Sequence, residues 1–135
     1  MRVIIDTNVL VSGIFFGGLP GRILKMWEDK KIKLVASSDI FHEYSGVIRR
    51  LGRKYPLLET SSILDLLAVE LEMVRTKKIH PSICRDPDDD KFIACAIAGK
   101  VEIIISGDQD LLALYMHQKI RFISPSQFFK EMLIR

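Results

Sequence analysis

The sequence predicts an α/β domain in which helices cover both faces of a parallel sheet. Short apolar runs rich in β-branched residues alternate with longer amphipathic segments, a pattern typical of such sheets. The run Val3–Ile5 and the core of Lys100–Ser106 are continuously apolar, as expected for strands buried on both faces. At 135 residues and 48% apolar content, the chain can bury a substantial core. We find no internal repeat or linker, so we expect residues 1–135 to form one domain.

The first half of the chain predicts two strands and two helices. Val3–Ile5 begins a buried strand, and Val9–Val11 is expected to continue it after a polar break. Five loop-forming residues then predict a loop: Gly13, Gly17, Gly18, Pro20 and Gly21. Arg22–Asp29 is expected to be a helix and Lys33–Ala36 a strand. The next helix is expected to start at the capping residues Ser37–Asp39 and to end near Gly52.

The second half predicts further alternation. Thr60–Ser62 are expected to cap a helix, followed by a short strand within Met73–Ile79. Small residues predict a helix over Asp90–Ala98 that Gly99 ends, and Lys100–Ser106 follows as a strand. The remaining elements are expected to be the helix Leu111–Met116, the edge strand Arg121–Ile123, and a helix that Ser124, Pro125 and Gln127 begin.

Four acidic residues occupy positions that this topology brings together. Asp6 directly follows the first strand, and Asp108 follows Lys100–Ser106 by two residues. Glu43 lies in the first turns of a helix that follows a strand, and Asp90 opens a helix. Sites in open parallel sheets form outside the carboxyl ends of the strands, so we expect the four carboxylates to converge there.

Gathered carboxylates repel one another unless a cation joins them, which predicts a hard divalent metal, Mg²⁺ or Mn²⁺. Each acid also has a structural interpretation. Asp6 and Asp108 could be caps, and Asp88 and Asp110 are better explained as a loop acid and a first-turn helix acid. Glu43 shares a helix face with apolar residues and needs a partner, either the metal or a salt bridge to an arginine.

Charge distribution supports a phosphate-handling site. Eight of the 17 acidic residues belong to the proposed crevice or its rim, which leaves nine against 20 Lys and Arg elsewhere. An acidic centre within a basic body suits a metal site that acts on a phosphate backbone. For any single Lys or Arg, a solvated surface position is the better explanation.

Other classes of protein lack their signals. Cys84 and Cys95 show no C-x-x-C spacing and are expected to be reduced thiols, and His42, His80 and His117 show no zinc-ligand spacing. The sequence has no P-loop, no G-x-G-x-x-G and no G-x-S-x-G. No apolar run reaches the ~18–20 residues needed to span a bilayer, and Asp6 and Asn8 interrupt any signal-peptide core. A cytoplasmic location is therefore expected.

Four segments in order resemble the PIN-domain family of metal-dependent ribonucleases: Val3–Leu10, Ser38–Glu43, Arg85–Ile93 and Ile105–Leu112. The likeness covers nearly the whole chain and is greatest to the toxins of toxin–antitoxin modules. It implies a three-layer α/β/α sandwich around a short parallel sheet. It also implies metal-dependent hydrolysis of RNA, a cognate antitoxin as partner, and a homodimer in which Phe15, Phe16 or Trp27 could take part.

The resemblance implies Asp6, Glu43, Asp90 and Asp108 as catalytic metal ligands, with Asn8 and Ser106 as supporting polar residues. Asp86 and Asp89 are further acids beside the third position. Asp90 is preferred because it directly precedes the helix start Lys91–Ala94. Two alternatives remain: a non-catalytic RNA-binding or scaffold module of the same fold, and a Mg²⁺-dependent phosphoacceptor or phosphatase domain. The phosphatase alternative expects an Asp at position 8, which is Asn.

Overall fold

The structure is a computed structural model that describes residues 1–56, 58–78 and 82–134. Within these ranges the strands are β1 (Arg2–Ile5), β2 (Lys33–Ala36), β3 (Glu72–Met73), β4 (Ile103–Ile105), β5 (Met116–His117) and β6 (Ile120–Ile123). They form one sheet in the order β3-β2-β1-β4-β6-β5, in which only the β5–β6 pair is antiparallel. The predicted α/β class is confirmed, with a mostly parallel sheet.

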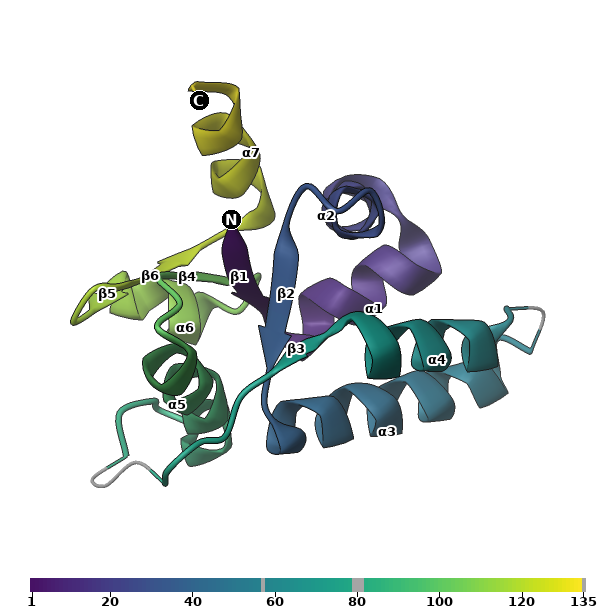
Figure 1. Cartoon of the computed structure of the whole chain (residues 1–135), viewed down its shortest axis with the longest axis horizontal. Coiled ribbons are helices and arrows are strands. Elements are labelled where there is room, and N and C mark those ends of the chain that lie inside the picture. Colours follow the sequence, from purple (N-terminus) through teal and green to yellow (C-terminus); the bar gives the residue numbers. More distant parts are fainter. Residues whose placement is uncertain (57, 79–81, 135) are drawn as a thin grey trace.

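Helices flank this sheet on both sides. They are α1 (Thr7–Phe16), α2 (Gly18–Glu28), α3 (Ser38–Lys54), α4 (Thr60–Glu70), α5 (Asp90–Gly99), α6 (Gln109–Leu114), α7 (Pro125–Ile134) and the 3-10 turn η1 (Pro87–Asp89). Figure 1 shows α1 and α2 on one side of β1 and β2, and α5 on the other. Helix α5 packs against β2, β4 and β6. This is the three-layer arrangement that the resemblance implies.

The prediction for residues 9–21 is wrong, because Val9–Val11 belong to α1 and most of the expected loop is helical. The Asp6 side chain caps α1 by accepting a hydrogen bond from the Val9 N–H, so the chain turns into a helix directly after β1. Gly13 lets α1 and α2 approach closely, since a Cβ there would lie 2.7 Å from Leu24 Cδ1 and 2.9 Å from the Pro20 backbone. The glycines therefore serve helix packing as well as the turn at Gly17.

Two boundaries in the second half also differ from expectation. Gly99 is the last residue of α5, and Lys100 adopts the left-handed conformation that was expected of Gly99. Gly99 instead faces Val35, Val74 and Val101, where a Cβ would lie 3.3–3.4 Å from their side chains. Strand β6 is not an edge strand, because β5 pairs with its outer side.

The predicted helix caps and element ends agree in part with the structure. The Ser37 and Ser124 hydroxyls cap α3 and α7 as predicted. Helix α4 is instead capped by the Glu59 side chain. Helix α6 ends at Leu114, so Met116 belongs to β5. Of the expected strand Met73–Ile79, β3 contains Met73, and Ile79 lies outside the described residues.

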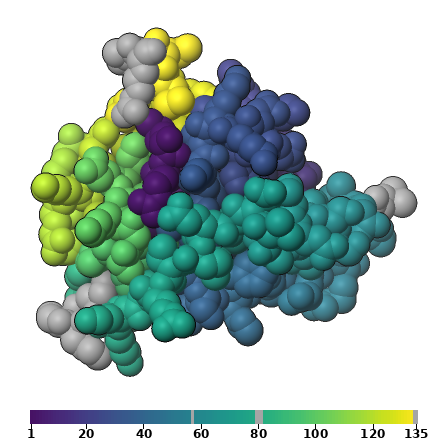
Figure 2. All heavy atoms as spheres, viewed as in Figure 1, coloured from purple at the N-terminus to yellow at the C-terminus, as the bar shows by residue number. Residues whose placement is uncertain are grey.

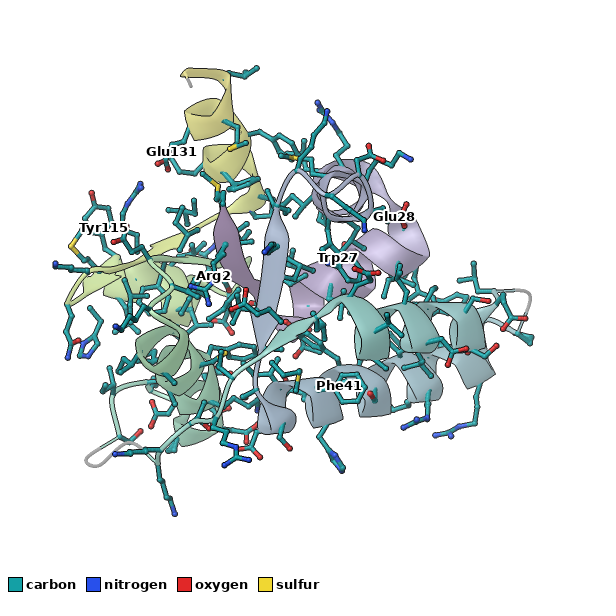
Figure 3. All side chains as sticks on the ribbon, in the orientation of Figure 1. Arg2, Trp27, Glu28, Phe41, Tyr115 and Glu131 are labelled. Carbon is teal, nitrogen blue, oxygen red and sulfur yellow. The ribbon has the colours of Figure 1, made fainter. Side chains whose placement is uncertain are left out.

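The core lies between the sheet and the helices and includes the fully buried side chains of Val3–Ile5 in β1 and of Ile104 and Ile105 in β4. Trp27 is part of this core, so it is not available for the expected dimer contact. Phe16 is 68% exposed, and its ring meets the Tyr55 ring edge-on. The labelled side chains in Figure 3 include Trp27 on α2 and Arg2 near the middle of the sheet.

No single helix in the described ranges is long and apolar enough to cross a membrane. Helices α1 and α2 reach that length and composition only as a pair, and they meet at an angle of 94°.

Candidate functional site

Asp6 and Ser106 meet because they follow the adjacent parallel strands β1 and β4. The Asp6 backbone N–H donates to the Ile105 carbonyl over 3.0 Å, which extends the strand pairing by one residue. The Ser106 hydroxyl donates to Asp6 Oδ2, and the Val9 N–H donates to Oδ1 over 2.9 Å. Ser106 Oγ also accepts the Asp108 N–H over 2.9 Å. Asp6, Ser106 and Asp108 therefore form one connected unit at the carboxyl edge of the sheet.

Asp6 is a buried carboxyl group, only 4% exposed. Burial raises its pKa, and the hydrogen bonds from Ser106 and Val9 oppose that rise. The negative charges of Asp108 and Glu43 raise the pKa further, which places both acids near Asp6. The structure thus places Asp6, Glu43 and Asp108 near enough for their charges to affect one another.

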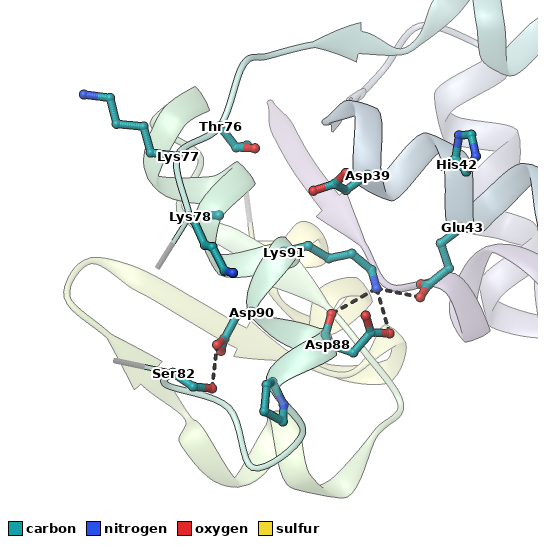
Figure 4. Close-up of a pocket in the computed structure, with 12 residues that line it drawn as sticks. Asp39, His42, Glu43, Thr76, Lys77, Lys78, Ser82, Asp88, Asp90 and Lys91 are labelled. Atoms are coloured by element: carbon teal, nitrogen blue, oxygen red, sulfur yellow. Dashed lines mark hydrogen bonds and ion pairs between the residues drawn. The ribbon is translucent and has the colours of Figure 1, made fainter. Parts of the chain in front are cut away.

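Glu43 has a cationic partner that the sequence interpretation did not identify. Lys91 Nζ lies 2.7 Å from Glu43 Oε1, and the Thr7 hydroxyl donates to Oε2. The same ammonium lies 3.0 Å from Asp88 Oδ2 and 2.9 Å from the Asp88 carbonyl (Figure 4). Burial lowers the Lys91 pKa, but the bonds to Glu43 and Asp88 outweigh it, so the pKa is raised and the side chain stays charged.

The Asp90 carboxylate accepts hydrogen bonds from the segment of the chain that precedes it. Oδ2 accepts a hydrogen bond of 2.6 Å from the Ser82 hydroxyl, and Oδ1 accepts the N–H groups of Ile83 and Cys84 at 3.1 and 2.8 Å. Burial raises the pKa of Asp90, but these hydrogen bonds outweigh it and lower the pKa. Figure 4 shows Asp90 beside Ser82, separate from the Glu43–Lys91 pair.

Asp89 has the opposite environment. Its pKa is raised to about 6, first by burial and then by the charges of Asp86 and Asp108, with a smaller contribution from Glu43. Lys91 acts against this rise. Asp89 therefore interacts electrostatically with Asp108 and Glu43, and it makes no side-chain cap bond at the start of α5.

The remaining acids and polar residues have local roles. The Asp108 carboxylate caps α6 by accepting the Asp110 N–H at 2.7 Å, and Asp86 caps η1 by accepting the Asp88 N–H at 3.0 Å. Asp110 lies 3.4 Å from Arg85 in an exposed ion pair. Asn8 is exposed in the first turn of α1, where its side chain makes no hydrogen bond to the described residues.

A model of the PIN domain matches residues 2–110. The chain belongs to the PIN-domain family. It is also 33% identical to the uncharacterized protein MJ1680 of Methanocaldococcus jannaschii, over 97% of this chain and 91% of that protein. The fold resembles a chain in the crystal structure of VapBC2 from Rickettsia felis bound to a DNA fragment from their promoter. That match has a TM-score of 0.62 and 14% identity, and it covers 92% of this chain and 98% of the other.

In this PIN domain, no three Asp, Glu, His or Cys side chains among the described residues are close enough to form a ready-made metal site. A cavity of about 730 Å³ lies beside Glu43, and its lining also includes His42, Asp90 and Lys91 but not Asp6 or Asp108. His80 lies outside the described residues, and His117 is in β5. Cys84 and Cys95 are free and buried, in agreement with the expected reduced thiols.

Sequence reasoning missed Thr7, Ser82 and Lys91 as partners of the acids. Thr7 follows Asp6 directly and Lys91 follows the acidic run, so adjacency to the motifs was the available signal for these two. Ser82 carried no such signal, because it lies eight residues before the carboxylate that it contacts.

Proposed function

We propose that this PIN domain is a metal-dependent endoribonuclease that hydrolyses RNA phosphodiester bonds and acts as the toxin of a toxin–antitoxin pair. The observation that carries the proposal is the hydrogen-bonded unit of Asp6, Ser106 and Asp108 at the carboxyl edge of the sheet, beside which Thr7 holds the Glu43 carboxylate. Family membership adds the expectation of nuclease chemistry to this geometry.

The donor set fits a hard divalent cation, Mg²⁺ or Mn²⁺, because it consists of carboxylate oxygens. The raised pKa values of Asp6 and Asp89 reflect burial together with negative charge that a cation would balance. We propose Asp6, Glu43, Asp89 and Asp108 as the metal ligands. Asp90, which the sequence favours over Asp89, is the alternative ligand to test. When bound, the metal would activate water and stabilise negative charge on the scissile phosphate.

The chain's own residues prepare this site. Ser106 and the Val9 N–H fix the orientation of the Asp6 carboxylate, and Thr7 fixes one oxygen of Glu43. The charged Lys91 lies within the acidic group, where it can offset negative charge brought by a substrate phosphate. Asn8 and Ser106 are proposed as supporting residues.

The partners are also part of the proposal. The match to a chain of a VapBC complex supports a cognate antitoxin for this PIN domain. A homodimer and a cytoplasmic location remain predictions. Of the residues predicted for the dimer contact, Phe16 is the most exposed, and its ring packs on Tyr55.

The direct test is cleavage of a mixed RNA pool by wild type and Asp6→Asn, each with Mn²⁺, Mg²⁺ or EDTA. Asparagine retains a capping oxygen for α1, so the variant should fold. We expect RNA cleavage only by metal-loaded wild type, with a loss of at least about 100-fold in Asp6→Asn. Asp65→Asn, the same change at an exposed position on α4, is the matched control.

Cleavage that persists in excess EDTA would refute the metal mechanism, and full activity of Asp6→Asn would refute the site. Binding of RNA without cleavage under any metal would support the non-catalytic alternative. A trapped acyl phosphate would instead support the phosphatase alternative.

A further inference from the structure

The segment 74–78 carries three basic residues over helix α5. A second cavity of about 460 Å³ is lined by Arg75, Lys77 and Lys78 from this segment and by Ala94, Ile97 and Ala98 of α5. Lys77, Lys78 and Ala94 also line the cavity beside Glu43. The two cavities therefore adjoin, and together they form a groove that leads from Glu43 across α5.

The far end of this groove is positive, whereas its near end beside Glu43 also carries Asp39, Asp88 and Asp90. Among the described residues, none that lines the second cavity is acidic, and Arg75, Lys77 and Lys78 form no ion pair with any of them. All three side chains are exposed. Figure 4 shows Lys78 directed toward Asp90 and Lys77 directed away from it, so the two ammonium groups lie apart. Such an arrangement suits a chain of anions better than one small anion.

The floor of the groove is apolar. Ile97 is 44% exposed on α5 beside the exposed Ala98. In Figure 2 the teal-green spheres of the basic segment lie exposed across the lower part of the molecule. Phosphates could contact the basic side chains while the faces of bases or sugars lie on the apolar floor, which is how unpaired strands are bound.

We propose that this groove binds single-stranded RNA and that Arg75, Lys77 and Lys78 contact phosphates on one side of the bond to be cleaved. The inference rests on the proposed function, because it makes the groove the path of the substrate into the acidic site. It adds a binding site that acts independently of the metal.

The test measures RNA binding rather than cleavage. A labelled single-stranded RNA is titrated in EDTA with wild type, with Lys77→Gln/Lys78→Gln, and with Lys119→Gln/Lys130→Gln. The control pair is exposed, lies on the β5–β6 turn and α7, and removes the same net charge. We expect affinity to fall at least tenfold in the groove variant and by less than twofold in the control. The slope of log affinity against log salt should also shrink by about 1.4 for two lost phosphate contacts.

Equal binding by the two double variants would overturn the proposal. The proposal would also be overturned if a polyglutamate peptide of equal charge competed with RNA for binding, because the groove would then bind any polyanion. Cleavage by Mn²⁺-loaded wild type is measured on the same RNA. If the groove variant loses RNA binding but wild type cleaves no RNA, the nuclease proposal is refuted and the groove proposal stands. If wild type cleaves RNA but the groove variant binds RNA as wild type does, the groove proposal is refuted and the nuclease proposal stands.

Discussion

At the residue scale, Asp89 and Asp90 are adjacent in sequence but have opposite environments. Asp90 accepts hydrogen bonds from Ser82, Ile83 and Cys84, whereas Asp89 is raised in pKa by burial and by neighbouring acids. The sequence predicts an acidic metal ligand in this run and favours Asp90 because that residue directly precedes a helix. The choice depends on the 3-10 turn η1 and on contacts with an upstream loop, which local patterns do not encode.

This difference gives a paired prediction. Asp89→Asn should weaken Mn²⁺ binding, measured by calorimetry, by about tenfold or more and lower RNA cleavage in parallel. Asp90→Asn should leave Mn²⁺ affinity within about threefold of wild type but lower the free energy of unfolding by roughly 1–3 kcal/mol, because it loses charged hydrogen bonds. The reverse pattern, with metal binding lost in Asp90→Asn alone, would restore Asp90 as the ligand.

At the element scale, periodicity was most informative where a segment is buried by its own apolar residues. Strands β1 and β4 were predicted because their isoleucines and valines are continuous and β-branched. Helix α1 and the first turn of α2 were missed, because glycines that permit close packing look like loop glycines in sequence. The capping role of Asp6 was weighed as an alternative to metal binding, yet one carboxylate caps α1 and also accepts the Ser106 hydroxyl that binds the Asp108 N–H.

The packing of α1 on α2 gives a prediction about Gly13. Gly13→Ala places a Cβ 2.9 Å from backbone atoms of Pro20, which cannot move aside as a side chain can. We expect a loss of about 1–3 kcal/mol in the free energy of unfolding, measured by urea denaturation. Gly46→Ala in α3 is the control, since its Cβ meets nothing within 4 Å. It should be neutral or stabilising by up to about 1 kcal/mol. Equal effects of both changes would contradict the close-packing role.

At the scale of the whole molecule, the parallel sheet could be predicted but its order could not. Alternating segments indicate parallel strands, whereas the neighbours of each strand depend on contacts between distant parts of the chain. Arg2 is one such contact. Its guanidinium spans from β1 to Glu72 of β3, with an Nε–Oε1 distance of 3.0 Å, and it donates over 2.7 Å to the Gly99 carbonyl of α5.

The Arg2–Glu72 contact should make stability depend on pH. The hydrogen bond from Arg2 lowers the Glu72 pKa, so the folded protein binds a proton less readily there than the unfolded chain does. The stabilisation is therefore fully present above the unfolded pKa of about 4.3 and is lost as pH falls through the lower folded pKa. Both side chains are about one-third exposed (36% and 37%), so solvent screening limits the contribution to roughly 0.5–1 kcal/mol.

Glu72→Gln should be less stable than wild type by that amount from pH 7 to about 5, and the difference should shrink below about pH 4. Urea denaturation across this range measures it, with Glu70→Gln at the exposed end of α4 as the control. If the stability difference between wild type and Glu72→Gln widened on acidification, Glu72 would be protonated more readily in the folded protein than in the unfolded chain. The third strand would then be held mainly by its backbone pairing to β2 and by the contact of Val74 N–H with the Ala36 carbonyl at 2.9 Å.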